Sequence, residues 1–141
     1  MITGPAILDH TVNGRSYRRW GNPPGNRSNH PDVAPHNTYR CRGEDSWCVI
    51  SVFNDQQWQA LCQAIGNPSW IRDSKFATNS ERVKNQDELD RNIEAWTLSR
   101  TPAEAMTILQ GIGVPAGAVQ TNEDKVERDP QLQARAFFPE I

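Results

Sequence analysis

The sequence predicts an α+β fold, in which a small antiparallel sheet packs against several helices. Two segments rich in β-forming residues flank a short polar turn, and amphipathic segments with helical spacing follow them. No segment repeats. A hairpin followed mainly by helices is typical of α+β folds. The length of 141 residues suits about one domain.

The N-terminal part of the chain is predicted to hold little regular structure. Residues 5–14 fit a short helix that Gly14 ends, so residues 1–20 are interpreted as a linker with a short helix. In residues 21–37, ten of seventeen positions are Gly, Pro or Asn, and four of them are prolines, which lack a backbone N–H. These residues are therefore expected to form a long loop, and such loops are usually functional or linkers. Residues 21–141 are interpreted as one small domain.

A β-hairpin is expected over residues 38–52, with one or two further short strands completing the sheet. Its strands are predicted at 38–42 and 47–52, and residues 43–46 have the composition of a turn. A helix capped by Asn54 or Asp55 follows and ends at Gly66. Its apolar face is formed by residues at helical spacing, namely Trp58, Leu61, Cys62 and Ile65.

Helices are predicted for most of the remaining chain. Two turns direct Trp70 and Phe76 inward, and one long helix is expected from about Asn79 to Leu98. Thr101 and Glu104 form a capping box that opens the next helix, which ends near Gly111. An extended piece at 114–119, short helices starting near 121 and 129, with Leu132 buried, and a strand from 137 complete the prediction. The apolar face of the long helix expected from about Asn79 to Leu98 is predicted to consist of Val83, Leu89, Ile93 and Trp96.

Composition excludes several classes of protein. The formal net charge is −2 and the isoelectric point is near 5.9, which gives no global reason to bind nucleic acid. No run of ~18 apolar residues suggests a membrane span, and the first residues do not resemble a signal peptide. Three cysteines without such a signal indicate reduced thiols in a cytoplasmic protein. Residues 1–42 carry a net charge of +4, which fits either a phosphate-bearing ligand or a solvated surface.

No catalytic or metal-binding constellation emerges from the residues alone. Two histidines and two cysteines, at His30, His36, Cys41 and Cys48, have the ligand types that zinc accepts, but the usual short cysteine spacing is missing. Small core residues in the hairpin are the alternative interpretation, and no metal site is predicted. Cys62 is interpreted as a core residue. The acidic side chains of the long helix, at positions 87, 88, 90 and 94, are interpreted as its solvated face.

An ordered set of short motifs resembles the family III CoA-transferases, which include formyl-CoA and carnitine CoA-transferases and alpha-methylacyl-CoA racemases. The likeness begins with Gly25-Asn26-Arg27 and His30-Pro31-Asp32-Val33-Ala34-Pro35-His36. It continues through the segments 54–58, 61–62, 66–68, 73–79, 82–83, 113–119 and 129–135.

This resemblance implies a large Rossmann-like domain, a smaller α+β domain and an interlocked dimer. It implies that an aspartate of the large domain attacks an acyl-CoA thioester while a small-domain loop covers the acyl group. By this resemblance, the present chain would correspond to the small domain with the linker that enters it. The resemblance implies no catalytic residue here, no covalently bound cofactor, and a coenzyme A thioester as the substrate of the parent enzyme. The substrate-binding loop that it implies contains Gly25, Asn26, His30, Pro31, Ala34, Pro35 and His36.

Two hypotheses follow. In the first, the chain is a fragment or truncated homologue of such an enzyme, inactive alone, that meets acyl-CoA or a carboxylic acid only together with a large domain. In the second, it is a self-standing module that kept the fold and binds a ligand or a protein. In either case exposed apolar termini would favour a homodimer.

Overall fold

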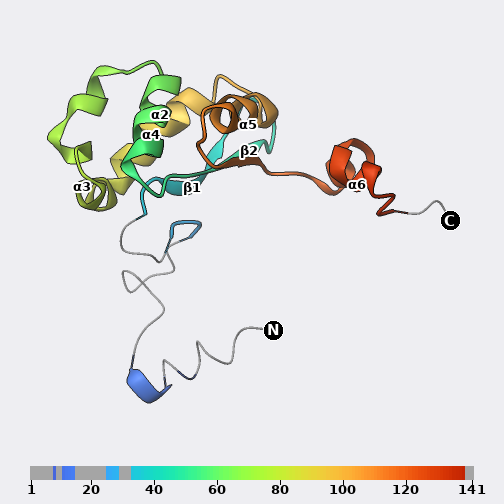
Figure 1. The fold of residues 1–141 in the computed structure, drawn as a ribbon, viewed down its shortest axis with the longest axis horizontal. Helices are drawn as coiled ribbons and strands as arrows, with labels where there is room; N and C mark the ends of the chain where they lie inside the picture. The colour runs from blue at the N-terminus through green and yellow to red at the C-terminus, as the bar shows by residue number, and fades with distance from the viewer. Residues whose placement is uncertain (1–7, 9–10, 15–24, 29–32, 139–141) are drawn as a thin grey trace.

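The structure is a computed structural model that describes residues 8, 11–14, 25–28 and 33–138. Figure 1 shows its elements along the chain, with the strands on one side of the main body and the helices α2, α4 and α5 stacked on the other. In chain order the elements are β1 (His36–Arg40), β2 (Trp47–Ser51), α2 (Asp55–Ala64), η1 (Ser69–Arg72), η2 (Ser74–Phe76), α3 (Asn79–Lys84), α4 (Gln86–Thr97), α5 (Pro102–Gly111), β3 (Ala116–Ala118), η3 (Asp124–Arg128) and α6 (Pro130–Ala134).

The sheet is antiparallel, with the order β1-β2-β3, and the α+β prediction is confirmed. Side chains alternate between its two faces. Tyr39, Cys48 and Ile50 belong to the covered face and are fully or almost fully buried. The opposite face, called here the open face, carries the cross-strand pairs His36–Ser51, Thr38–Val49 and Arg40–Trp47. Val49 on this face is 37% exposed.

The core lies between the covered face and the helices. Phe76 is fully buried, as predicted, whereas Trp70 is half-buried and meets the Phe76 ring edge-on at 5.6 Å between centroids. Gly66, which follows α2, has φ +91° and ends that helix as expected. Hydrophobic members of the core include Tyr39, Cys41, Cys48, Ile50, Val52, Trp58, Leu61, Cys62, Phe76, Leu89, Ile93, Trp96, Ala105, Leu109 and Val114.

The predicted long helix is two helices, α3 and α4, which is a correction. The break falls at Asn85, whose backbone leaves the helical region with φ −103° and ψ 27°. The Asn85 side-chain amide donates to the Lys75 and Glu81 carbonyl oxygens at 3.3 and 3.0 Å, and such bonds compete with helix continuation. Val83 is only half-buried, and the neighbouring Arg82 is the fully buried residue.

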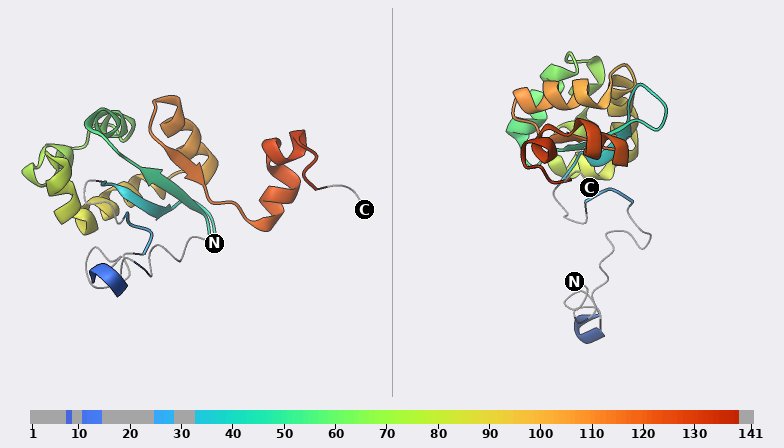
Figure 2. Two further views of the ribbon diagram at one scale, coloured as in Figure 1. Left: turned by 60° about the horizontal axis from the view of Figure 1, so that its bottom comes forward. Right: turned by 90° about the vertical axis from the view of Figure 1, so that its right-hand side faces the viewer.

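The two ends of the chain differ from the prediction in part. Leu8 and residues 11–13 are helical and Gly14 has φ +63°, as expected for a helix that stops there. Phe137 and Phe138 are not in a strand and are 62% and 47% exposed, and the rest of that predicted strand lies outside the described residues. Leu132 is half-buried because α6 packs mainly on η3, and Figure 2 shows both set apart from the main body.

Helix side chains satisfy backbone groups along the outer edges of the sheet. On β1, the Arg40 N–H donates to Glu94 Oε1 at 3.3 Å, and Thr97 Oγ1 donates to the Arg40 carbonyl oxygen at 2.6 Å. On β3, Gln110 Nε2 donates to the Ala116 carbonyl oxygen at 2.8 Å. Each edge is thus bound to a helix of the same chain.

β1 itself begins at His36 and ends at Arg40, two residues earlier than predicted. Arg40 pairs with Trp47, so the hairpin connection spans residues 41–46 rather than 43–46. None of the described helices is long and apolar enough to cross a membrane.

Candidate functional site

The predicted substrate-binding loop is described at both of its ends. Gly25 and Asn26 are exposed in a turn, where Gly25 has φ +63°. His30 and Pro31 lie outside the described residues. Ala34 and Pro35 are fully buried, so their side chains fix the end of the loop in the body of the domain. His36 opens β1 and is half-buried.

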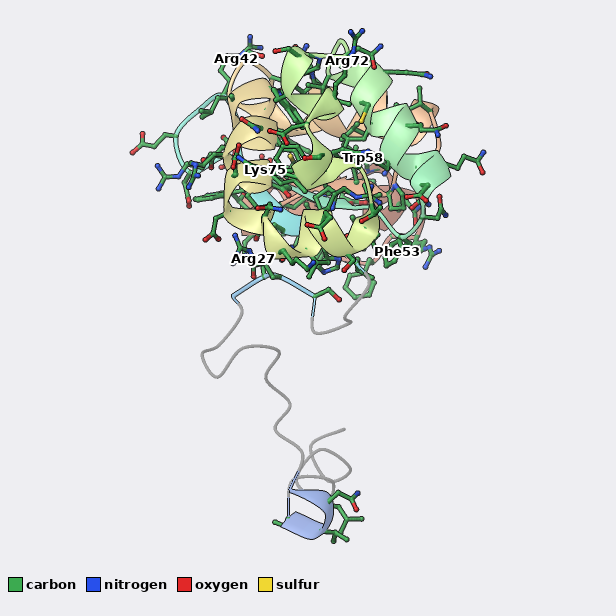
Figure 3. All side chains as sticks on the ribbon, turned by 90° about the vertical axis from the view of Figure 1, so that its left-hand side faces the viewer. Arg27, Arg42, Phe53, Trp58, Arg72 and Lys75 are labelled. Atoms are coloured by element: carbon green, nitrogen blue, oxygen red, sulfur yellow. The ribbon has the colours of Figure 1, made fainter. Side chains whose placement is uncertain are left out.

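Arg27 anchors the first end of the loop to α4. Its Nε and Nη2 atoms donate to Asp90 Oδ2 at 3.0 and 2.7 Å, and Nη2 also lies 2.6 Å from Asp87 Oδ1. Partial burial of the guanidinium opposes its charge, but the bonds to both carboxylates outweigh this, and the pKa of Arg27 is raised. Figure 3 shows Arg27 at the edge of the body next to the loop segment.

Asp90 is the centre of this anchor. Asn37 Nδ2 also donates to Asp90 Oδ2, at 2.9 Å, and the Tyr39 hydroxyl donates to Oδ1 at 2.8 Å. Burial raises the pKa of Tyr39 well above its usual range, and the Asp90 charge raises it further. The Asp90 side chain is 13% exposed, whereas that of Asp87 is 79% exposed. The assignment of Asp90 to the solvated face was therefore wrong, because β1 and the loop cover it.

Arg82 anchors the second end of the loop. Its Nε donates to the Ala34 carbonyl oxygen at 3.3 Å, and Nη2 donates to Asp55 Oδ1 at 2.8 Å. Nη1 donates to the Phe76 carbonyl oxygen, and the guanidinium lies 4.7 Å from the centre of the Trp58 ring. A buried cation needs such complete pairing. Sequence reasoning missed Arg82, because a lone arginine inside a helical segment is normally exposed.

A third cluster, called here the His36 cluster, surrounds the first residue of β1. The Ser51 Oγ and His36 Nδ1 atoms lie 2.9 Å apart, and the His36 ring meets the Phe53 ring at 6.4 Å between centroids. Phe53 is 55% exposed, and Figure 3 shows it at the same edge of the body as Arg27. Ser51 and Phe53 were not predicted as site residues, because only the pairing of β1 with β2 brings them next to His36.

The cysteines are core residues rather than nucleophiles. Burial raises the pKa of Cys62 to about 11 and raises those of Cys41 and Cys48 as well, so the thiols are protonated at neutral pH. All three thiols are free. His36 lies on the open face while Cys48 lies on the covered face, so these two candidate zinc ligands are on opposite sides of the sheet, and His30 lies outside the described residues. Within the described ranges, no three His, Cys, Asp or Glu side chains gather closely enough to hold a metal ion.

Comparisons with known proteins agree along nearly the whole chain. The family model described as CoA-transferase family III matches residues 2–141. The chain is 40% identical over 112 residues to a probable CoA-transferase of Mycobacterium tuberculosis, covering 79% of this chain and 14% of that protein. It is 39% identical over 105 residues to the succinyl-CoA–D-citramalate CoA-transferase of Chloroflexus aurantiacus, covering 74% of this chain and 26% of that protein.

A solved structure shows the same arrangement. The crystal structure of a CAIB/BAIF family protein from Brucella suis matches with a TM-score of 0.79 and 32% identity, over 95% of this chain and 33% of that chain. The present chain thus spans between about a seventh and a third of the length of these relatives. Because the family match runs from residue 2 to residue 141, this chain belongs to the family III CoA-transferases.

Proposed function

We propose that the chain forms the small domain of a family III CoA-transferase, and that residues 25–36 are the loop that covers the acyl group. The observation that carries this proposal is the double anchor. Arg27 ties one end of the loop to α4 and Arg82 ties the other end to the core. Because both anchors lie within this chain, the two ends of the loop are held in place without any contribution from a ligand.

The reaction proposed for the complete enzyme is transfer of CoA between an acyl-CoA and a carboxylic acid through an aspartyl intermediate. A reactive anhydride formed on the way must be kept from water, and a loop held at both ends can exclude water when it closes. The loop residues Gly25, Asn26, His30, Pro31, Ala34, Pro35 and His36 are proposed to form this cover.

We propose that the 141-residue chain does not catalyse this transfer alone. It spans only 14–33% of the length of the relatives described above. Its thiols are buried and protonated, and Asp90 is fully engaged in the loop anchor. The enzymatic aspartate is proposed to come from a large domain. A cytoplasmic location, supported by the free cysteines, and a homodimer through the exposed Phe137 and Phe138 belong to the same proposal.

A domain exchange tests the proposal. The matching segment of the Chloroflexus aurantiacus enzyme would be replaced by the corresponding residues of this chain, to give a chimera. Its transfer of CoA from succinyl-CoA to D-citramalate would be measured beside that of the isolated chain. We expect transfer by the chimera and none by the isolated chain. A folded chimera without activity would contradict the small-domain role, and turnover by the isolated chain would contradict its inactivity.

A further inference from the structure

We infer that His36 is a specificity-determining residue: Ser51 holds its imidazole so that Nε2–H donates a hydrogen bond to an oxygen of the acyl substrate. This inference rests on the proposed function, because it assigns a partner to a residue of the same loop.

The surroundings of Ser51 fix the direction of its hydrogen bond with His36. His36 and Ser51 are directly opposite each other on β1 and β2, and Ser51 is only 9% exposed. Within the described part of the chain, the Ser51 hydroxyl has one partner, His36 Nδ1 at 2.9 Å. A proton on Nδ1 would leave the Ser51 proton without an acceptor in a poorly hydrated place, which is unfavourable. The hydroxyl therefore donates to Nδ1, and in the neutral ring the proton is on Nε2.

Ser51 and Phe53 together fix the orientation of the His36 ring. The bond to Ser51 fixes one side of the imidazole, and the ring of Phe53 packs against it at an angle of 69°. A ring held on two sides loses little freedom when it binds a ligand, so a hydrogen bond from Nε2–H costs little ordering. Among the described residues no protein group accepts a hydrogen bond from Nε2, so a substrate oxygen can take the place of water at this donor.

The surface beside His36 Nε2 is apolar and exposed. Phe53 is 55% exposed next to the His36 ring, and Val49 on the same open face is 37% exposed. β3 contributes Gly117 opposite Val49, and no atom lies within 4 Å of where a side chain would begin there. A donor beside uncovered apolar side chains fits an acyl chain that ends in an oxygen. The oxygen belongs to the carboxylate of the acid or to the thioester carbonyl of the acyl-CoA.

Nitrogen-detected NMR of the full 141-residue chain tests the tautomer directly. We expect the neutral His36 ring to carry its proton on Nε2 in the wild type, and a mixture of both tautomers in Ser51→Ala. A wild-type ring with the proton on Nδ1, or a tautomer that Ser51→Ala leaves unchanged, would overturn the inference.

Kinetics of the active chimera tests the ligand. His36→Phe keeps a ring for packing against Phe53 but removes the donor, whereas His36→Gln retains an amide N–H near the position of Nε2. We expect His36→Phe to raise a KM about tenfold or more, with a smaller change in kcat, and His36→Gln to stay within about threefold of the parent. Gln59→Ala, at an exposed position of α2, is the control and should leave both constants unchanged.

The two substrates separate the two oxygen sources. A KM change confined to D-citramalate assigns the bond to the carboxylate of the acid, and one confined to succinyl-CoA assigns it to the acyl-CoA. An active chimera whose His36→Phe variant equals the parent overturns the inference and leaves the proposed function standing. A folded but inactive parent chimera contradicts the proposed function and removes the ligand of His36 with it.

Discussion

Replacing Asp90 with asparagine should destabilise the domain far more than the same change at Asp87. Asp90→Asn keeps the shape of the side chain but replaces one acceptor oxygen with an amide that faces the donors of Arg27, Asn37 and Tyr39. At least one of these donors then lacks an acceptor. Loss of a charge-assisted bond and an unsatisfied donor each cost ~1–3 kcal/mol, and Arg27 is partly screened by water, so the expected loss is about 2–4 kcal/mol.

Asp87→Asn is the matched control. Asp87 also pairs with Arg27 from the same helix, but its side chain is 79% exposed, and exposed ion pairs contribute about 0–1 kcal/mol. Urea unfolding, followed by circular dichroism and by tryptophan fluorescence, gives both free energies of unfolding. A double change, Tyr39→Phe with Asp90→Asn, should cost about 1 kcal/mol less than the sum of the single changes. Equal losses for Asp90→Asn and Asp87→Asn would refute the assignment of Asp90 as the centre of the anchor.

Three further outcomes are expected. Burial raises the pKa of Tyr39 well above its usual range, so the free energy of unfolding should stay constant below the ordinary tyrosine pKa of about 10. It should fall as the pH rises above that value and through the raised pKa of Tyr39 in the folded chain. Urea unfolding at several pH values measures this fall, and Tyr39→Phe should reduce it. Leu61→Ala should cost about 2–5 kcal/mol in thermal or urea unfolding, and Ile65→Ala clearly less, because Leu61 is fully buried and Ile65 is half-buried; similar losses would contradict this packing. The thiols should react slowly with an aromatic disulfide reagent in the native chain and rapidly in denaturant, and fast native labelling of Cys62 would show that its burial is wrongly described.

Local signals explain why the sequence predicts α2 and α5 well. Asn54 caps α2 by accepting the Gln57 N–H at 2.9 Å, and Thr101 and Glu104 form the capping box that opens α5. Both devices involve residues three positions apart. Such capping bonds can be predicted from a sequence, because helix geometry fixes the spacing between the two residues that form them.

The two loop anchors could not be predicted, because their partners are distant in sequence. Arg27 and Asp90 are 63 residues apart, and Arg82 and Ala34 are 48 residues apart. A charged residue in a helix is usually solvated, and only the folded topology shows that Arg82 and Asp90 are covered. The His36 cluster was missed for a related reason: His36 and Ser51 are 15 residues apart, and only the pairing of the two strands places them opposite each other.

The bonds between helix side chains and the sheet edges bear on how copies of this chain meet. An edge strand with unpaired backbone groups is a template onto which another chain can add a strand, and runaway addition produces aggregates. Here Glu94 and Thr97 occupy the outer groups of Arg40, and Gln110 occupies the carbonyl of Ala116, on a β3 of only three residues. A second copy would have to displace these side chains before its own strand could pair. Side chains of the same chain therefore compete with strand addition at both edges of the small sheet, which disfavours its growth into an aggregate.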